Sequence, residues 1–146
     1  MAAIYEVANT TVAFNAYETE GGGVEVQWQV PTLDINLGGA LTAARRTDAV
    51  KVPSNFSTIA HLNVRIFDAA TPFIAWVYGP DQSDSFPGTS APLGNFNAPT
   101  GAAADLFQQI RVRTSSTGTI AARLNGASPA DIYSAATMGF TWSRRS

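Results

Sequence analysis

The stretch VEVQWQV, residues 24–30, decides the fold class of this chain. Its three valines and Trp28 share one parity, whereas Glu25, Gln27 and Gln29 share the other, which is the period of a β-strand with one buried face. The pattern therefore predicts a strand that places Trp28 in a core. We expect this strand to end at Pro31, because proline has no N–H to donate to a neighbouring strand.

Strand periodicity recurs on both sides of this stretch. Alternating apolar residues predict further strands near 12–14, 33–37, 58–67, 71–78, 110–112, 120–124 and 138–142. Met138, Phe140 and Trp142 are expected on one face of the last strand. Short helical turns are allowed within 41–52, 102–109 and 128–131, but no long helix is expected. Roughly seven or eight strands predict an all-β, antiparallel sandwich or barrel-like domain spanning residues 1–146.

The strongest predicted strand pair comprises residues 58–67 and 71–78, which we expect to form a β-hairpin because only a short turn separates them. In the second strand both parities are apolar, with Phe73, Ala75 and Val77 on one and Ile74, Trp76 and Tyr78 on the other. A strand of this kind is covered on both faces. One cover is the core of the domain, and the other is either the following segment or a neighbouring subunit.

Residues 79–105 form the most unusual segment. They hold four of the eight prolines and four of the twelve glycines, yet they also carry Phe86, Leu93 and Phe96. Neither helix nor strand is expected there. We interpret the segment as an extended arm whose apolar side chains need an outside surface. The predicted partner interface comprises Phe86, Leu93, Phe96, Trp76, Tyr78, Arg144 and Arg145, and residues 1–11 are a candidate N-terminal arm.

The composition narrows the class of function. The chain contains no cysteine, which excludes disulfides, thiolate metal sites and cysteine nucleophiles. Only 14% of its residues are charged, against about 25% in typical soluble domains. Neutral polar residues and a single lysine, Lys51, suit surfaces packed against neighbours, although a GC-rich genome explains the lysine count equally well. The net charge of −2 argues against direct nucleic-acid contact, and no secretory signal or membrane span is predicted.

Motifs for catalysis are not found in the sequence. The only histidine, His61, lies on the polar parity of its strand and is interpreted as a surface or interface residue. No nucleophile elbow, phosphate-binding loop or dinucleotide fingerprint occurs. Carboxylates gather near Glu18 and Glu25, and Asp81 and Asp84 open the arm; whether that last pair binds a cation stays open. We predict no catalytic, cofactor or metal residues and no enzymatic activity.

The overall composition of the chain and the order of its segments resemble those of a known class of proteins. Its extended N-terminal residues 2–11, the Pro- and Phe-bearing arm and the Ala/Thr-rich connections resemble small bacteriophage virion proteins, nearest in style to head decoration (cement) proteins. The resemblance implies a homotrimer that is made in the host cytoplasm, sits on the virion and clamps neighbouring major capsid subunits. Two alternatives stay open: a phage tail-tube or other tail protein, and a carbohydrate-binding β-sandwich in which Trp76 and Tyr78 form the sugar platform.

Overall fold

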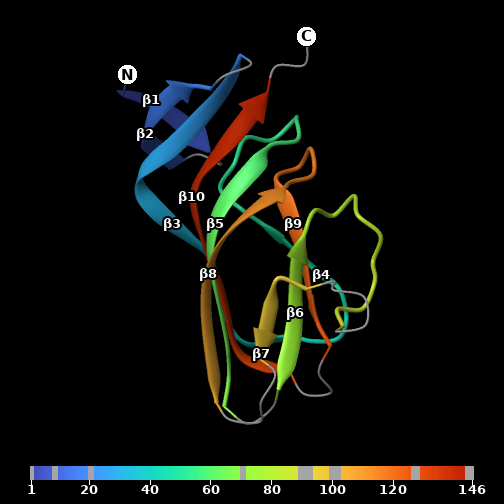
Figure 1. The fold of residues 1–146 in the computed structure, drawn as a ribbon. Helices are drawn as coiled ribbons and strands as arrows, with labels where there is room; N and C mark the ends of the chain where they lie inside the picture. Colours follow the sequence, from blue (N-terminus) through green and yellow to red (C-terminus); the bar gives the residue numbers. More distant parts are fainter. Residues whose placement is uncertain are drawn as a thin grey trace.

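The fold was analysed on a computed structural model, which describes residues 2–7, 10–19, 22–69, 72–88, 94–98, 103–125 and 129–143. Within these ranges the chain forms strands and no helix (Figure 1). The strands are β1 (Ala2–Val7), β2 (Thr10–Glu18), β3 (Gly23–Leu41), β4 (Arg46–Ala49), β5 (Ile59–Asp68), β6 (Phe73–Tyr78), β7 (Phe96–Ala98), β8 (Ala104–Arg113), β9 (Thr119–Leu124) and β10 (Ala130–Ser143).

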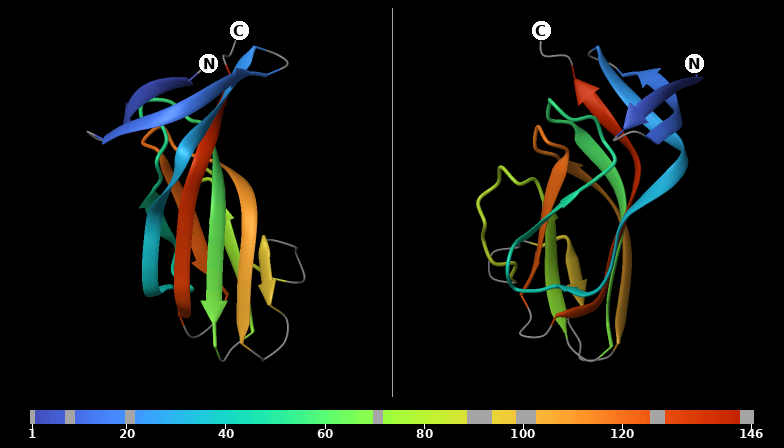
Figure 2. Two further views of the ribbon diagram at one scale, coloured as in Figure 1. Left: turned by 90° about the vertical axis from the view of Figure 1, so that its left-hand side faces the viewer. Right: turned by 180° about the vertical axis from the view of Figure 1, so that it is seen from behind.

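The strands make two antiparallel sheets that pack face to face as a sandwich (Figures 1 and 2). The larger sheet has the order β1-β2-β3-β10-β5-β8, and the smaller has the order β4-β9-β6-β7. The inward side chains of both sheets meet in one core, whose largest fully buried members include Leu41, Leu62, Ile66, Phe73, Phe96, Ile120, Leu124 and Tyr133. The all-β prediction is confirmed. Burial of this apolar surface is the main force that holds the two sheets together.

β3 does not end at Pro31, so that prediction is wrong. Gln27 pairs with Gly139 of β10, and Thr32 pairs with Thr137, but the register shifts between these two positions. Pro31 lies in the interval that has no β10 partner, and the pairing of β3 with β2 has already ended. No ladder hydrogen bond therefore requires an N–H from Pro31, which is the condition under which proline is tolerated inside a sheet.

Two register shifts with β10, one beside Pro31 and one between Leu33 and Ile35, determine which face of β3 is buried. Trp28 lies in the core as predicted, but Val30 is 73% exposed, although it shares the parity of Trp28. Leu33 is also exposed, and Ile35 returns to the core. An extra residue in one strand of a pair reverses the alternation that follows it. The even positions of β3 therefore face the core as far as Trp28, and the odd positions face it from Ile35 onward, after a second register shift between Leu33 and Ile35.

The same irregularity divides β10. Phe140 is buried and Trp142 packs against the core, but Met138 instead lies near Asn63 on the opposite side of the sheet. The expected shared face is therefore wrong for Met138. Gly139 explains the geometry, since a Cβ at this position would lie 2.0 Å from the carbonyl oxygen of Val26. Only glycine permits β3 and β10 to approach so closely here.

The predicted hairpin of β5 and β6 is wrong as well. β5 lies between β10 and β8 in the larger sheet, whereas β6 lies between β9 and β7 in the smaller one. The chain thus crosses from one layer to the other after β5, where the backbone N–H of Ala69 donates to Asp131 Oδ2 at 2.8 Å. Two strands joined by a hairpin and two strands joined by a crossover both show alternating buried and exposed residues. The periodicity of the sequence therefore does not distinguish the two connections.

The segments expected to allow helical turns are extended. Residues 46–49 form β4, residues 104–109 open β8, and β10 begins at Ala130, with 126–128 outside the described ranges. The candidate N-terminal arm is also corrected, because residues 2–7 pair with β2 as an edge strand of the larger sheet. Long-range pairing overrides the weak helical preference of the alanines.

Candidate interaction surfaces

The predicted arm is attached to its own domain along β6. Asn95 acts as a clamp: its Oδ1 accepts from the Val77 N–H and its Nδ2 donates to the Val77 carbonyl, both at 2.9 Å. β7 then pairs with β6, with Phe96 opposite Ala75. The Phe96 ring is 1% exposed and lies in the core. The predictions that the arm contains no strand and that Phe96 serves a partner are therefore wrong.

Tyr78 is also enclosed by its own chain. Its ring is 2% exposed and stacks on Trp76, with the centroids 4.0 Å apart. Its hydroxyl donates to Asp84 Oδ1 at 2.7 Å, and burial together with this bond raises the pKa of Tyr78 to about 12. The second cover of β6 thus comes from the arm. Tyr78 offers no face to a partner or a sugar ring, and Trp76 is half-buried.

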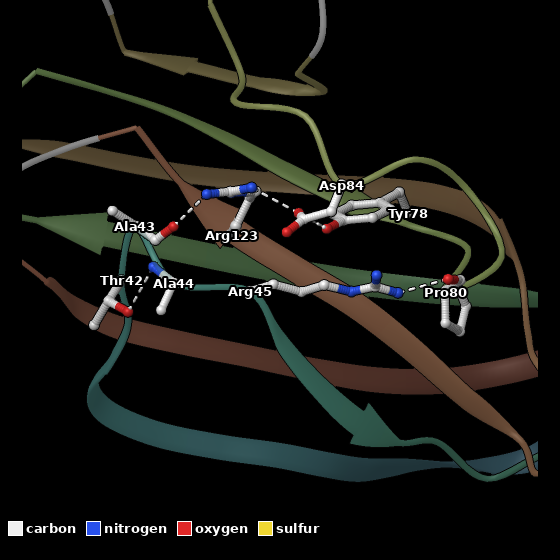
Figure 3. A network of polar contacts seen from close by, with 8 residues as sticks. All are labelled: Thr42, Ala43, Ala44, Arg45, Tyr78, Pro80, Asp84 and Arg123. Carbon is white, nitrogen blue, oxygen red and sulfur yellow. Dashed lines mark hydrogen bonds and ion pairs between the residues drawn. The ribbon is translucent and has the colours of Figure 1, made fainter.

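Arg123 forms the base to which the arm is fixed (Figure 3). It is 6% exposed, and its Nη1 donates to Asp84 Oδ1 at 2.6 Å while its Nη2 donates to the Ala43 carbonyl at 2.7 Å. The hydrogen bond from Tyr78 and the Arg123 guanidinium lower the pKa of Asp84. We call Tyr78, Asp84 and Arg123 the arm anchor. Because the anchor engages Asp84, this carboxylate serves the fold of the arm.

Phe86 lies on the outside of the anchor. The Arg123 guanidinium carbon is 3.9 Å from the centroid of its ring, and the ring is 62% exposed. A cation over an aromatic face stabilises the ring in one position. Phe86 is therefore an exposed aromatic side chain with a fixed support, and it remains a candidate interface residue. Leu93, Arg144 and Arg145 lie outside the described residues.

A second surface is the outer face of the larger sheet. A shallow groove of about 590 Å³ there is lined mainly by polar side chains, namely Glu25, Gln27, His61, Gln109 and Arg111, together with Trp28, Leu62, Ile110 and Met138. Within it, His61 Nε2 lies 2.8 Å from Thr141 Oγ1. Burial and the charge of Arg111 lower the pKa of His61, which favours the neutral imidazole at pH 7. The groove therefore combines a neutral imidazole with the opposite charges of Glu25 and Arg111, which lie 3.9 Å apart.

Phe107 is the residue of this face that sequence reasoning missed. It is 72% exposed on β8, and the Arg65 guanidinium carbon lies 5.2 Å from its ring centroid. Arg65 in turn donates to both oxygens of Asp105, at 2.9 and 2.8 Å. The alternation of Leu106, Ile110 and Val112 with charged or polar neighbours was the available signal, but the alanines at 102–104 suggested a helical turn.

No family model matches the chain, and no curated protein matches it. In the part of the chain that the structure describes, no three His, Asp or Glu side chains are grouped as a metal site. The same residues contain no helix long and apolar enough to cross a membrane.

Proposed function

We propose that this chain is a non-enzymatic virion structural protein that acts by docking onto neighbouring subunits, and within that class a head decoration protein that clamps major capsid subunits. The observation that carries the proposal is the Phe86 ring, 62% exposed on the arm and supported by Arg123. Fixed aromatic side chains of this kind are typical centres of protein interfaces. The resemblance of the whole chain to small virion proteins favours a capsid as the surface they meet.

The physical basis of such a role is preorganisation. Binding energy is lost when a flexible loop must be ordered on contact. Here the arm anchor and the Asn95 clamp order the loop beforehand, so burial of Phe86 would contribute about 1.5–3 kcal/mol at each site with little ordering cost. A protein that binds only the mature shell stabilises it by mass action. The many equivalent sites of a shell multiply this small contribution.

The polar contacts of the outer groove support the non-enzymatic part of the proposal. A hydroxyl activated by histidine normally needs a carboxylate on the other ring nitrogen to orient the imidazole. Among the described residues, none accepts a hydrogen bond from the second nitrogen of His61. The Asp84 carboxylate at the other surface is paired with Arg123. Both groups are better suited to holding a surface in shape than to proton transfer.

The decisive experiment measures binding of the purified chain to expanded capsids that lack decoration protein. We expect the wild type to saturate the shell and raise the temperature at which it ruptures. Phe86→Ala should weaken binding by about tenfold or more, whereas Tyr17→Ala, which removes another exposed aromatic ring on β2, should bind like the wild type. A wild-type chain that binds no expanded shell, or equal losses in both variants, would overturn the proposal.

The same purified chain separates the two alternatives. A tail-tube protein should form rings that stack into tubes, since head-to-tail contacts repeat. A carbohydrate-binding module should show a tryptophan fluorescence change with oligosaccharides that Trp76→Ala abolishes. The trimer implied by the resemblance stays a prediction.

A further inference from the structure

β8 is a long and regular edge strand. It pairs with β5 over ten consecutive positions, from Ala104 opposite Asp68 to Arg113 opposite Ile59, without a register shift. No described strand pairs with its other edge. Natural edge strands are usually protected from further pairing by shortness, proline or a bulge. β8 has none of these and carries charges only toward its ends, at Asp105, Arg111 and Arg113, so the middle of its outer edge offers unpaired backbone donors and acceptors to another strand.

The middle of this edge is open to solvent. Phe107, Gln108 and Gln109 are all exposed, although Gln108 has the inward parity of Leu106 and Ile110. An inward residue is exposed only where the opposite sheet does not cover the edge. The C-terminal end of β8 is different, since a Cβ on Gly79 would lie 2.8 Å from the Arg113 carbonyl oxygen. The accessible part of the edge is therefore centred on Gln108.

We propose that the occupant of this edge is the β8 strand of a second copy of the chain, paired antiparallel with Gln108 on the two-fold axis. In this register Asp105 lies opposite Arg111 of the partner subunit, and the symmetry repeats the contact. Leu106 lies opposite Ile110 of the partner subunit, and Phe107 lies opposite Gln109 of the partner subunit. The two larger sheets would join into one continuous sheet across the dimer.

Charge and apolar character both agree with this register. Directly opposed residues of antiparallel strands point to the same face. Asp105 and Arg111 both have the outward parity, and the side chain of Arg111 is 68% exposed, with its Nη2 3.9 Å from Glu25 Oε2. Leu106 and Ile110 are half-buried on the inward face and pack against the core. The pairing thus adds opposite charges outside and extends the apolar layer inside.

The pairing also covers Phe107, the most exposed aromatic ring among the residues whose burial the structure describes. Phe107 and the partner's Phe107 would be diagonal neighbours across the axis, a separation that aromatic side chains bridge. The ring is 72% exposed in the single chain, which is unfavourable for a large apolar group in water. Dimerisation would remove both rings from solvent together.

A register shifted by two residues is less favourable. It would put Gln109 on the axis and Asp105 opposite Arg113 of the partner subunit. Arg113, however, already donates its Nε to Ser57 Oγ at 3.1 Å and lies against Gly79. The residue then opposite Leu106 would be Val112, which its own chain already buries. The Gln108 register leaves Arg113 and Val112 in the contacts that they already make, and it adds Arg111 of the partner subunit to the existing ion pair of Asp105 with Arg65.

A single-cysteine experiment reads this register directly, because the chain has no cysteine of its own. Opposed residues in antiparallel strands have Cα atoms about 4.5–5.5 Å apart, within the range of a disulfide. Gln108→Cys should therefore oxidise to a covalent dimer on a non-reducing gel. Gln109→Cys is the matched control, since the two copies of residue 109 would be about 8 Å apart, too far for a disulfide. Preferential crosslinking of Gln109→Cys, or no crosslinking in either variant, would overturn the assignment.

A charge exchange tests the same contact without a crosslink. Asp105→Arg and Arg111→Glu each place two like-charged pairs in the homodimer, and each should weaken self-association about thirtyfold, or about 2 kcal/mol, in sedimentation equilibrium. An equimolar mixture should associate again, because every cross-strand pair is then opposite in charge. A wild-type chain that stays monomeric at millimolar concentration contradicts the proposal. The experiment uses no capsid, so its result is separate from that of the proposed virion role.

Discussion

Phe96 and Phe86 lie ten positions apart in the same Pro- and Gly-rich segment, yet their surroundings are opposite. Phe96 is buried opposite Ala75, where β7 pairs with β6, whereas Phe86 stays on the surface above Arg123. Both positions are fixed by polar contacts of the chain itself, through Asn95 for one ring and Asp84 for the other. Irregular backbone can thus be rigid, and exposure of one ring in it does not imply exposure of the next.

The largest expected effect is the difference in the free energy of unfolding between the alanine variants of Phe96 and Phe86. Phe96→Ala should lower the free energy of unfolding by about 3–5 kcal/mol, because it leaves a cavity in the core. Phe86→Ala should lower it by no more than about 1 kcal/mol, the value of an exposed cation–π contact. Urea titration followed by circular dichroism measures both variants. Equal losses would mean that the two rings do not differ in burial as described.

A smaller effect is expected from the support of the exposed ring. Arg123→Met keeps much of the side-chain volume but removes the hydrogen bonds to Asp84 and to the Ala43 carbonyl. We expect a loss of about 2 kcal/mol in the free energy of unfolding. Proteolysis within the arm should also accelerate, since the loop loses its fixed position. Arg45→Met is the comparison variant, because it removes an exposed contact to the Pro80 carbonyl and a long cation–π contact with Tyr78, and it should change stability much less.

The contrast between the two rings shows what the sequence alone can predict. The alternation around Trp28 was sufficient for the all-β fold, since burial of one strand face is a local pattern. The partner of each strand was not predictable, because β5 joins β10 and β8 rather than β6. Pairing is decided by the total packing of distant segments. The exposure of Val30 was not predictable for a similar reason, because the register shift beside Pro31 depends on the pairing of β3 with β10.

The candidate surfaces follow the same rule. The exposure of Phe86 was predictable from its place in a segment rich in proline and glycine, whereas its contact with Arg123 was not; its interface role stays a prediction. Phe107 was missed because neighbouring alanines obscured a strand whose exposure depends on β8 being an edge. Edge position is a property of the whole sheet order, and no window of sequence contains it.

A third effect is expected in the alkaline titration of the arm anchor. The folded-state pKa of Tyr78 is raised to about 12, above the ordinary value of 10.0, by burial and by the bond to Asp84. The folded chain therefore holds this proton more tightly than the unfolded chain. Its contribution to stability is complete below pH 10 and is lost as the pH rises toward 12. Tyr133 also has a raised pKa because it is buried, so the wild-type profile contains both groups. Tyr78→Phe isolates the anchor: the unfolding free energy measured from pH 9 to 12 should fall less steeply in this variant. Identical slopes in the two proteins would mean that Tyr78 ionises as freely in the folded chain as in water, and that the arm does not enclose it.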